Sequence, residues 1–214
     1  MLVSKPDLSS IEGAARAELD PKFAAREVAI TNGRQVIRFS AKAIRAGHRG
    51  ELKEAGALLA EAGELLAEST AAIAGHPDIK IGILNDAAKE YAEAHLFLAM
   101  ARGDELPAAA DLGTRMAPYL NGLGEAVGEL RRSLLDQLRS EDFAGAERLL
   151  EIMDEVVDLL ASLDYPDGMT GGLRRTTDIA RSLTERSRAD LTSALIADRL
   201  RQDIAAVRTL PEPG

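Results

Sequence analysis

The sequence predicts an all-α protein, a single domain (1–214) built as a bundle of about six long antiparallel helices. Hydrophobic residues make up 46% of the chain and aromatic residues only 3%, with Ala and Leu dominant, which favours closely packed helices over sheets. Apolar residues also recur at helical spacing over segments of roughly 20 residues, longer than the usual 11 or 12. At 214 residues the chain is long enough to close one hydrophobic core.

Turn residues set the expected bounds of these helices. Asp20-Pro21 begins the first, because Asp can cap a helix and Pro suits its first position. GHPD (75–78) ends the second, and DYPDGMTGG (164–172) is a loop before the last. The expected helices run approximately over residues 21–46, 51–74, 81–102, 118–138, 140–163 and 173–208. Residues 1–19 and 209–214 are expected to be loosely ordered.

Composition and charge exclude several classes of protein. The chain has no cysteine, so neither disulfides nor thiolate metal sites can form. The N-terminus lacks an apolar run of signal-peptide length and no segment approaches a membrane span, which favours a cytoplasmic protein with no membrane partner. The net charge of −9 argues against a uniformly basic surface that would coat nucleic acid, so a local basic stripe is informative.

Such a stripe lies on the first expected helix. At 100° per residue its five cations fall within a sector roughly 80° wide. They are Arg34, Arg38, Lys42, Arg45 and Arg49, called the basic stripe below. Like charges one turn apart repel one another, and a polyanion would relieve that repulsion. The alternative is a solvated face paired with acidic residues of neighbouring helices.

A second charged stripe, on the last expected helix, has alternating signs. It contains Arg174, Asp178, Arg181, Glu185 and Arg188. Each cation has an acid one turn away, so a structural role is expected. Arg175 and Arg186 lie off this stripe and remain free to act.

Four glutamates on two expected helices form a candidate metal site. KEYAEAHLF (89–97) places Glu90 and Glu93 three apart on a helix that is apolar on two sides, close enough for both to reach one cation. Glu125 and Glu129 lie one turn apart on the next helix. Carboxylate oxygens suit Mg²⁺ or Mn²⁺ rather than a soft metal. The alternative is that all four are solvated surface acids.

Other features of the sequence bear on this site. Gly122, Gly124 and Gly128 would let another backbone approach the acidic helix closely, since glycine otherwise costs helix stability. A ferritin-like di-iron centre would need Glu-x-x-His on two helices, and His95 follows Glu93 by only two residues. The motifs of nucleophilic hydrolases and of phosphate-binding loops are absent from the sequence.

Four stretches, in order, resemble the translin/TRAX family and together cover most of residues 30–192. GRQVIRFSAKAIRAGHR (33–49) is similar to the family's opening basic helix, and KEYAEAHLF to its glutamate helix. YLNGLGEAVGELRR (119–132) is similar to the acidic helix that follows. DYPDGMTGGLRRTTDIARSLTERSRADLT (164–192) resembles the C-terminal segment.

This resemblance implies a specific activity. The acids are more similar to those of the catalytic TRAX type, which implies a Mg²⁺-dependent endoribonuclease that cleaves single-stranded RNA inside a hollow octameric shell of identical subunits. Glu90, Glu93, Glu125 and Glu129 would be the catalytic metal ligands, although Glu125 lies where TRAX chains usually have Asp. The basic stripe would line the RNA-binding interior. The alternative is a non-catalytic oligomer of the translin type that binds single-stranded nucleic acid, and a scaffold that binds neither is a third.

Overall fold

A computed structural model describes residues 7–79 and 82–208, and this part of the chain contains α-helices and no strand. The all-α fold class predicted from the sequence is confirmed. The helices are α1 (Ser9–His48), α2 (Leu52–Ala74), α3 (Gly82–Arg102), α4 (Met116–Arg139), α5 (Phe143–Ala161), α6 (Asp167–Thr170) and α7 (Leu173–Arg208). None of the helices within the described ranges combines the length and apolar character of a membrane span.

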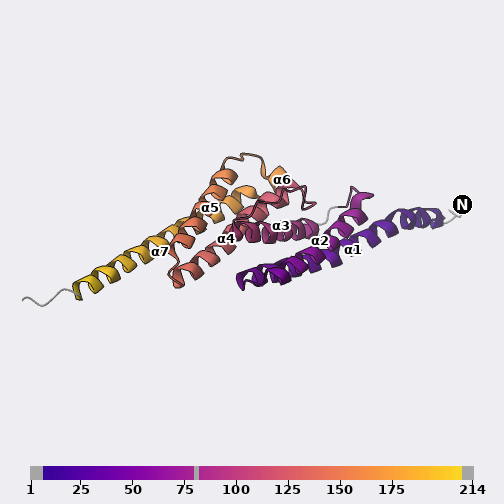
Figure 1. The fold of residues 1–214 in the computed structure, drawn as a ribbon. Coiled ribbons are helices and arrows are strands. Elements are labelled where there is room, and N and C mark those ends of the chain that lie inside the picture. The colour runs from indigo at the N-terminus through magenta and orange to yellow at the C-terminus, as the bar shows by residue number, and fades with distance from the viewer. Residues whose placement is uncertain (1–6, 80–81, 209–214) are drawn as a thin grey trace, which may run out of the picture.

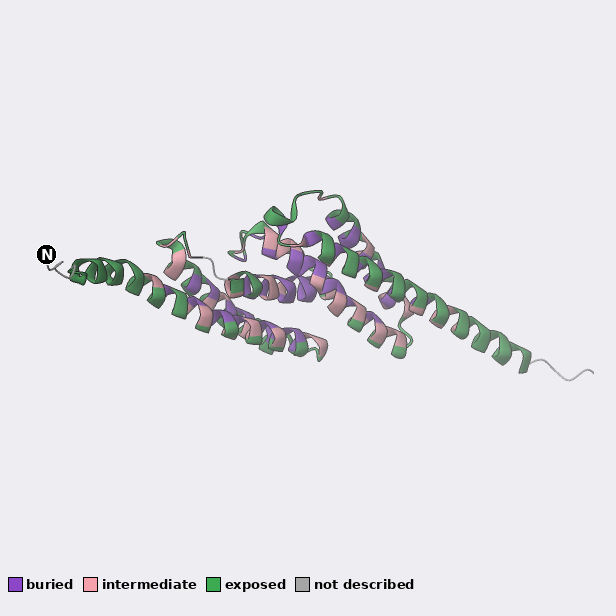
Figure 2. Ribbon diagram, turned by 180° about the vertical axis from the view of Figure 1, so that it is seen from behind, coloured by how far each residue is buried: buried purple, intermediate pink, exposed green. Residues whose placement is uncertain are grey.

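The molecule is elongated, with α3 at its centre (Figure 1). Helices α1 and α2 form one half and pack against one side of α3, while α4 packs against another side. Helices α5 and α7 pack against α4 and against each other, and complete the other half. The start of α1 and the end of α7 extend from the packed region in opposite directions, and both are exposed (Figure 2). One buried apolar cluster includes residues of α1, α2, α3, α4, α5 and α7.

The central position of α3 explains the unusual composition of its sequence. From Tyr91 to Met100 every residue except His95 is buried, including Glu93. Small residues such as Ala87, Ala92 and Ala94 let neighbouring helices approach from several directions. A helix that is buried almost all round is expected to be apolar all round, so a carboxylate within it needs a specific explanation.

The expected start of the first helix at Asp20-Pro21 is wrong. Helix α1 begins at Ser9, and Pro21 lies inside it. The segment before Pro21 is rich in Ala, Glu, Arg and Leu, which are strong helix formers, and this preference continues the helix past one missing hydrogen bond. Asp7 accepts a hydrogen bond from the Ser9 backbone amide at 3.0 Å and satisfies one free donor at the new start. Residues 9–19 are therefore helical, although all of them are exposed.

The remaining differences from the predicted elements are small. The loop predicted at 164–172 contains the single helical turn α6, and Gly171, the residue that follows this turn, has a φ of 65°. Glycine has no Cβ and adopts this left-handed conformation without strain, so the chain turns here into α7. Ile81, the expected start of the third helix, and residues 1–6 and 209–214 lie outside the described residues.

Candidate metal centre between helices α3 and α4

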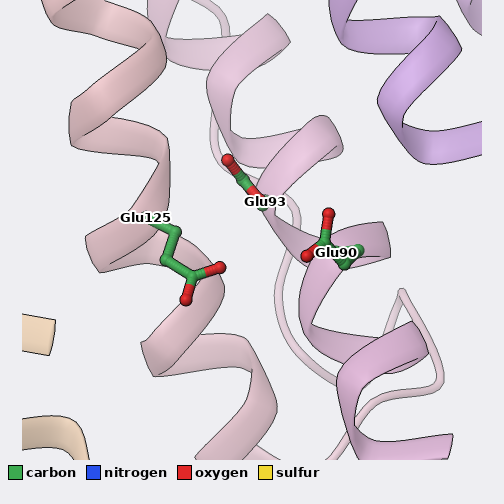
Figure 3. A group of neighbouring side chains, drawn as sticks. All are labelled: Glu90, Glu93 and Glu125. Carbon is green, nitrogen blue, oxygen red and sulfur yellow. The ribbon is translucent and has the colours of Figure 1, made fainter. Parts of the chain in front are cut away.

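Three of the four predicted acids come together across the interface between α3 and α4. One carboxylate oxygen from each of Glu90, Glu93 and Glu125 lies within 4.8 Å of the other two. Figure 3 shows the side chain of Glu125 extending from α4 toward the two glutamates of α3. These three residues are called the glutamate triad below. The triad joins residues that are more than 30 positions apart, so it is a product of the fold and not of one helix.

Gly122 permits the two helices to approach this closely. A Cβ built on Gly122 would lie 2.6 Å from the backbone oxygen of Lys89 and 2.8 Å from the backbone nitrogen of Glu93. Both distances are far below van der Waals contact, and the atoms concerned are backbone atoms that move only with the whole helix. Gly124 faces α7 instead, where a Cβ would meet the Thr176 side chain. The predicted role of these glycines is confirmed for Gly122.

Replacing Gly122 by Ala is therefore expected to destabilise the protein and to widen the triad. Overpacking of this kind costs about 1–3 kcal/mol. The matched control is Gly128→Ala on the same helix, where the nearest atom to a new Cβ, on Leu183, is at an ordinary 3.8 Å. This control is expected to gain up to about 1 kcal/mol from helix propensity. Urea unfolding measures the free energy of unfolding of both variants. Equal changes of the same sign would contradict a close approach of α3 and α4 at Gly122.

Glu93 is the most buried member of the triad, with 8% of its surface exposed. Burial raises the pKa of its carboxyl group to about 8, and repulsion from Glu90 and Glu125 adds to this effect. Burial also raises the pKa of Glu90, partly opposed by the nearby Lys89. Within the described ranges the Glu93 carboxylate has no hydrogen-bond donor. A buried acid with such neighbours would be strongly stabilised by a cation.

Lys89 places a positive charge next to the triad. Its Nζ donates a hydrogen bond to Glu125 Oε1 at 2.7 Å and lies 3.9 Å from Glu90 Oε1. Burial works against the charged form of Lys89, but the hydrogen bond to Glu125 and the surrounding carboxylates outweigh it and raise its pKa. Lys89 was not among the predicted site residues, because adjacent positions on a helix point in different directions and only the packing of α4 brings it to Glu125.

Glu129, the fourth predicted acid, is not part of the triad. Its Oε2 accepts a hydrogen bond of 2.6 Å from Nε2 of His48, at the end of α1. This hydrogen bond lowers the pKa of Glu129 despite its partial burial. The Ser133 hydroxyl lies 3.4 Å from the other ring nitrogen of His48, and the ring packs against Phe97 at 4.6 Å. The contact ties α1 to the acidic helix, and no sequence motif indicated it.

All five residues of the basic stripe are exposed. Arg49 pairs with Glu51 and lies 3.8 Å from Glu54, whereas the other four make no ion pair with residues that the structure describes. The alternative of a stripe neutralised by neighbouring helices therefore applies to Arg49 only. Since His48 contacts Glu129, the C-terminal end of the stripe lies next to α4.

The residues of the triad fit a hard divalent cation. Carboxylate oxygens are the ligands preferred by Mg²⁺ and Mn²⁺. Two oxygens bound to one Mg²⁺ at about 2.1 Å lie no more than about 4.2 Å apart, and the observed limit of 4.8 Å is within a small side-chain rotation of that value. The triad carries three acidic groups against the single charge of Lys89, so a divalent ion would improve the local charge balance.

Comparison with other sequences finds a relative without a known role. No family model matches the sequence. An uncharacterised protein of Methanocaldococcus jannaschii is 26% identical over 188 residues, which are 87% of this chain and 84% of that protein.

Comparison with solved structures finds the same fold in C3PO. A complex of Archaeoglobus AfC3PO with duplex RNA is 37% identical, has a TM-score of 0.79, and aligns over 86% of this chain and 96% of that one. A second AfC3PO structure is 36% identical, with the same TM-score and coverage of 86% and 97%. Apo-NeC3PO from Neurospora, 18% identical with a TM-score of 0.72 over 90% and 99% of the chains, supports the fold alone.

Proposed function

Since AfC3PO is of the translin/TRAX type, this chain belongs to the translin/TRAX family, and we propose that it is a metal-dependent endoribonuclease. In this proposal it cleaves single-stranded RNA inside a homo-oligomeric shell. The glutamate triad is the observation that carries this proposal. A protein that only bound RNA would gain nothing from a buried, mutually repelling set of acids, because these acids also repel phosphates. That RNA is the substrate is supported by the AfC3PO structure, which is a complex with duplex RNA.

Glu90, Glu93 and Glu125 would hold a Mg²⁺ or Mn²⁺ ion in this proposal. When bound, such an ion supplies a more acidic water molecule and positive charge beside the scissile phosphate. Glu93 carries a proton at neutral pH because its pKa is about 8, and it must release that proton to act as an anionic ligand. Glu129 is the outer member of the proposed acidic set, held by His48 and adding negative potential at Glu90 and Glu93.

The basic stripe would hold the RNA backbone in this proposal. Replacing Arg38 and Arg45 by Glu is expected to weaken the binding of RNAs of unrelated sequence and to flatten the dependence of binding on salt. With fewer phosphate contacts, binding releases fewer counterions from the RNA. The matched control reverses Arg139 and Arg174, two exposed arginines that pair with Asp136 and Asp164. Filter binding at several salt concentrations measures both pairs. Equal salt slopes for the two double variants would show that the stripe is only a solvated face.

Assembly into a homo-oligomer is supported by apolar side chains on the two extended helix ends. At the end of α7, Ile196, Leu200, Ile204 and Val207 lie on one face at spacings of four, four and three residues, and each is at least 45% exposed. At the start of α1, Ile11, Leu19 and Phe23 are at least 56% exposed. Apolar stripes on helices that leave their own bundle mark contact surfaces. We propose that identical subunits cover them, with an octamer as the expected shell.

Light scattering is expected to give a mass several times the chain mass of 22.8 kDa. The double variant Ile196→Asp with Leu200→Asp should shift the mass to smaller species, because two buried charges would be left unpaired in the interface. Leu106→Asp is the control, since Leu106 is also partly exposed (41%) but lies in the loop before α4. A monodisperse monomer of the parent at micromolar concentration would remove the shell from the proposal.

The proposed activity is tested by incubating labelled single-stranded RNA with the purified protein in Mg²⁺ and in EDTA. Internal cleavage products are expected with Mg²⁺ and not with EDTA. A duplex of the same sequence, run in parallel, tests the preference for single strands. Binding without cleavage in Mg²⁺ or Mn²⁺ would favour the translin-type alternative, in which the chain binds nucleic acid and does not cut it.

A further inference from the structure

A cavity of about 870 Å³ lies beside the glutamate triad, between the starts of α3, α4 and α7 and the turn α6. Helix α4 packs against α3, α6 and α7 and so connects these segments (Figure 1). The volume is within the range of about 300–1,000 Å³ that is typical of small-molecule sites. Of the residues that line this cavity, only Glu125 and Lys89 belong to the candidate metal centre described above, so the others have no assigned role.

The cavity continues into the triad. A smaller cavity of about 360 Å³ is lined by all three triad glutamates, and it shares Glu125, Thr176 and Ile179 with the larger one. A chain with its scissile phosphate at the triad would therefore have space for its neighbouring nucleotide in the larger cavity.

Two arginines line the cavity at separate positions. Arg115 precedes α4 and donates a hydrogen bond to the Asn85 side chain. Arg175, in the first turns of α7, makes no ion pair or side-chain hydrogen bond with any residue of 7–79 or 82–208. Its neighbour Arg174 points elsewhere and pairs with Asp164. Asp86 also lines the cavity, from α3. Guanidinium groups without an acidic partner are suited to bind phosphate.

Three apolar side chains line the same cavity while remaining open to solvent. Met116 is 59% exposed, Met169 is 68% exposed and Ile179 is 52% exposed. Methionine side chains adapt their shape and make favourable sulfur contacts with aromatic rings. A flat nucleobase would cover these side chains, and methionine contacts would discriminate weakly between bases.

Asn121 makes the cavity a fixed part of the fold. Its amide nitrogen donates to the backbone oxygens of Ala117 and Thr170, and its amide oxygen accepts from the Thr176 hydroxyl at 2.7 Å. This buried side chain thereby joins α4 to both α6 and α7. The methionines and arginines on these segments are held near the triad before any ligand binds.

We propose that this cavity is a nucleotide subsite that binds the nucleotide adjacent to the cleaved bond. Arg175 binds its phosphate, and Arg115 adds positive charge elsewhere in the same cavity. Met116, Met169 and Ile179 contact its base. The assignment to the neighbour of the cleaved bond rests on the proposed function, whereas the binding of a nucleotide does not require cleavage. The two can therefore be tested separately.

The test is isothermal titration of the full-length protein in EDTA with adenosine 5′-monophosphate and with inorganic phosphate. Arg175→Gln is expected to weaken binding of both by about tenfold, the effect of losing one charged hydrogen-bonding group. Met169→Ala is expected to weaken the binding of adenosine monophosphate by about threefold and to change the affinity for inorganic phosphate by less than about twofold, because only the contact with the base is lost. Thermal unfolding of each variant checks that the fold is retained.

Arg174→Gln is the matched control, since it removes the same charge from the adjacent position outside the cavity. Equal affinities of the Arg174 and Arg175 variants for adenosine monophosphate, or no binding of adenosine monophosphate by the parent, would overturn the proposed subsite. RNA cleavage by the parent then reports on the proposed function independently. If the parent cleaves RNA and Arg175→Gln raises KM while Arg174→Gln does not, the subsite is supported. If the parent binds the nucleotide through Arg175 and Met169 but does not cleave RNA, the nucleotide subsite is supported and the proposed ribonuclease activity is contradicted.

Discussion

Replacing Glu93 by Gln is expected to reduce RNA cleavage by about 10³-fold or more, because a misplaced metal loses several kcal/mol of transition-state stabilisation. Gln keeps the size and shape of the side chain and removes its anionic oxygen. Glu93 is 8% exposed and lies against α4, so the smallest possible change is needed to keep α3 and α4 in place. RNA binding should persist or strengthen, since one potential negative charge near the phosphates is lost.

Glu61→Gln is the matched control for this variant. Glu61 is an exposed glutamate of α2, and it makes no ion pair within the part of the chain that the structure describes. A surface substitution of this kind changes stability by less than about 0.5 kcal/mol and should leave cleavage unchanged. Cleavage rates are measured on one labelled single-stranded RNA at saturating Mg²⁺, with binding measured in parallel in EDTA. Equal cleavage by the parent and both variants would contradict the assignment of the triad as the metal site.

The helices were predictable because their ends depend on local chemistry. Both ends of α2, α4 and α7 lie within two residues of the expected positions, since Gly and Pro break the apolar periodicity there. The start of α1 was not predictable by the same rule. Asp20-Pro21 has the residues of a helix start, but the helix-forming segment before it continues the helix through Pro21. Local signals compete, and their relative strength is not visible in a motif.

The site was predictable only in part, for a different reason. The spacing of Glu90 and Glu93 on one helix and that of Glu125 and Glu129 on the next are local properties, and the similarity to a family implied that the two pairs share one site. The contact of Lys89 with Glu125 and that of His48 with Glu129 join residues 36 and 81 positions apart. Such pairs depend on how α1, α3 and α4 pack, and no periodicity within one helix reports on them. The same holds for the cavity beside the triad, whose walls come from four separate segments.

The stability of the protein in EDTA is expected to fall as the pH rises from about 5 to about 9, and Glu93→Gln should remove much of that fall. Burial, with repulsion from Glu90 and Glu125, raises the pKa of Glu93 from 4.5 to about 8 in the folded protein. The folded state therefore binds this proton more tightly than the unfolded state. Its contribution to stability is fully present below pH 4.5 and is lost as the pH rises through about 8.

Glutamine has no proton to lose at this position, so the variant and the parent should differ only at high pH. Near pH 5 their free energies of unfolding should be similar, because Glu93 is protonated in the folded parent. Near pH 9 the variant should be more stable by on the order of 3 kcal/mol, since the parent then carries an ionised carboxylate in a buried site. Urea unfolding at a fixed protein concentration measures the difference, which keeps any contribution of assembly constant.

Near pH 9, Mg²⁺ should reverse the order of stability and make the parent more stable than Glu93→Gln. This result would distinguish a metal ligand from an acid that is only buried. Metal binding requires the ionised carboxylate, so stabilisation by Mg²⁺ should increase with pH in the parent and be much weaker in Glu93→Gln. The parent should therefore gain most from Mg²⁺ near pH 9, where it is weakest in EDTA. Glu61→Gln should follow the parent under every condition, because its site is exposed. Parallel pH profiles of the parent and Glu93→Gln in EDTA would mean that Glu93 does not hold a proton in the folded protein. Equal responses of the two to Mg²⁺ would mean that its carboxylate does not bind the ion.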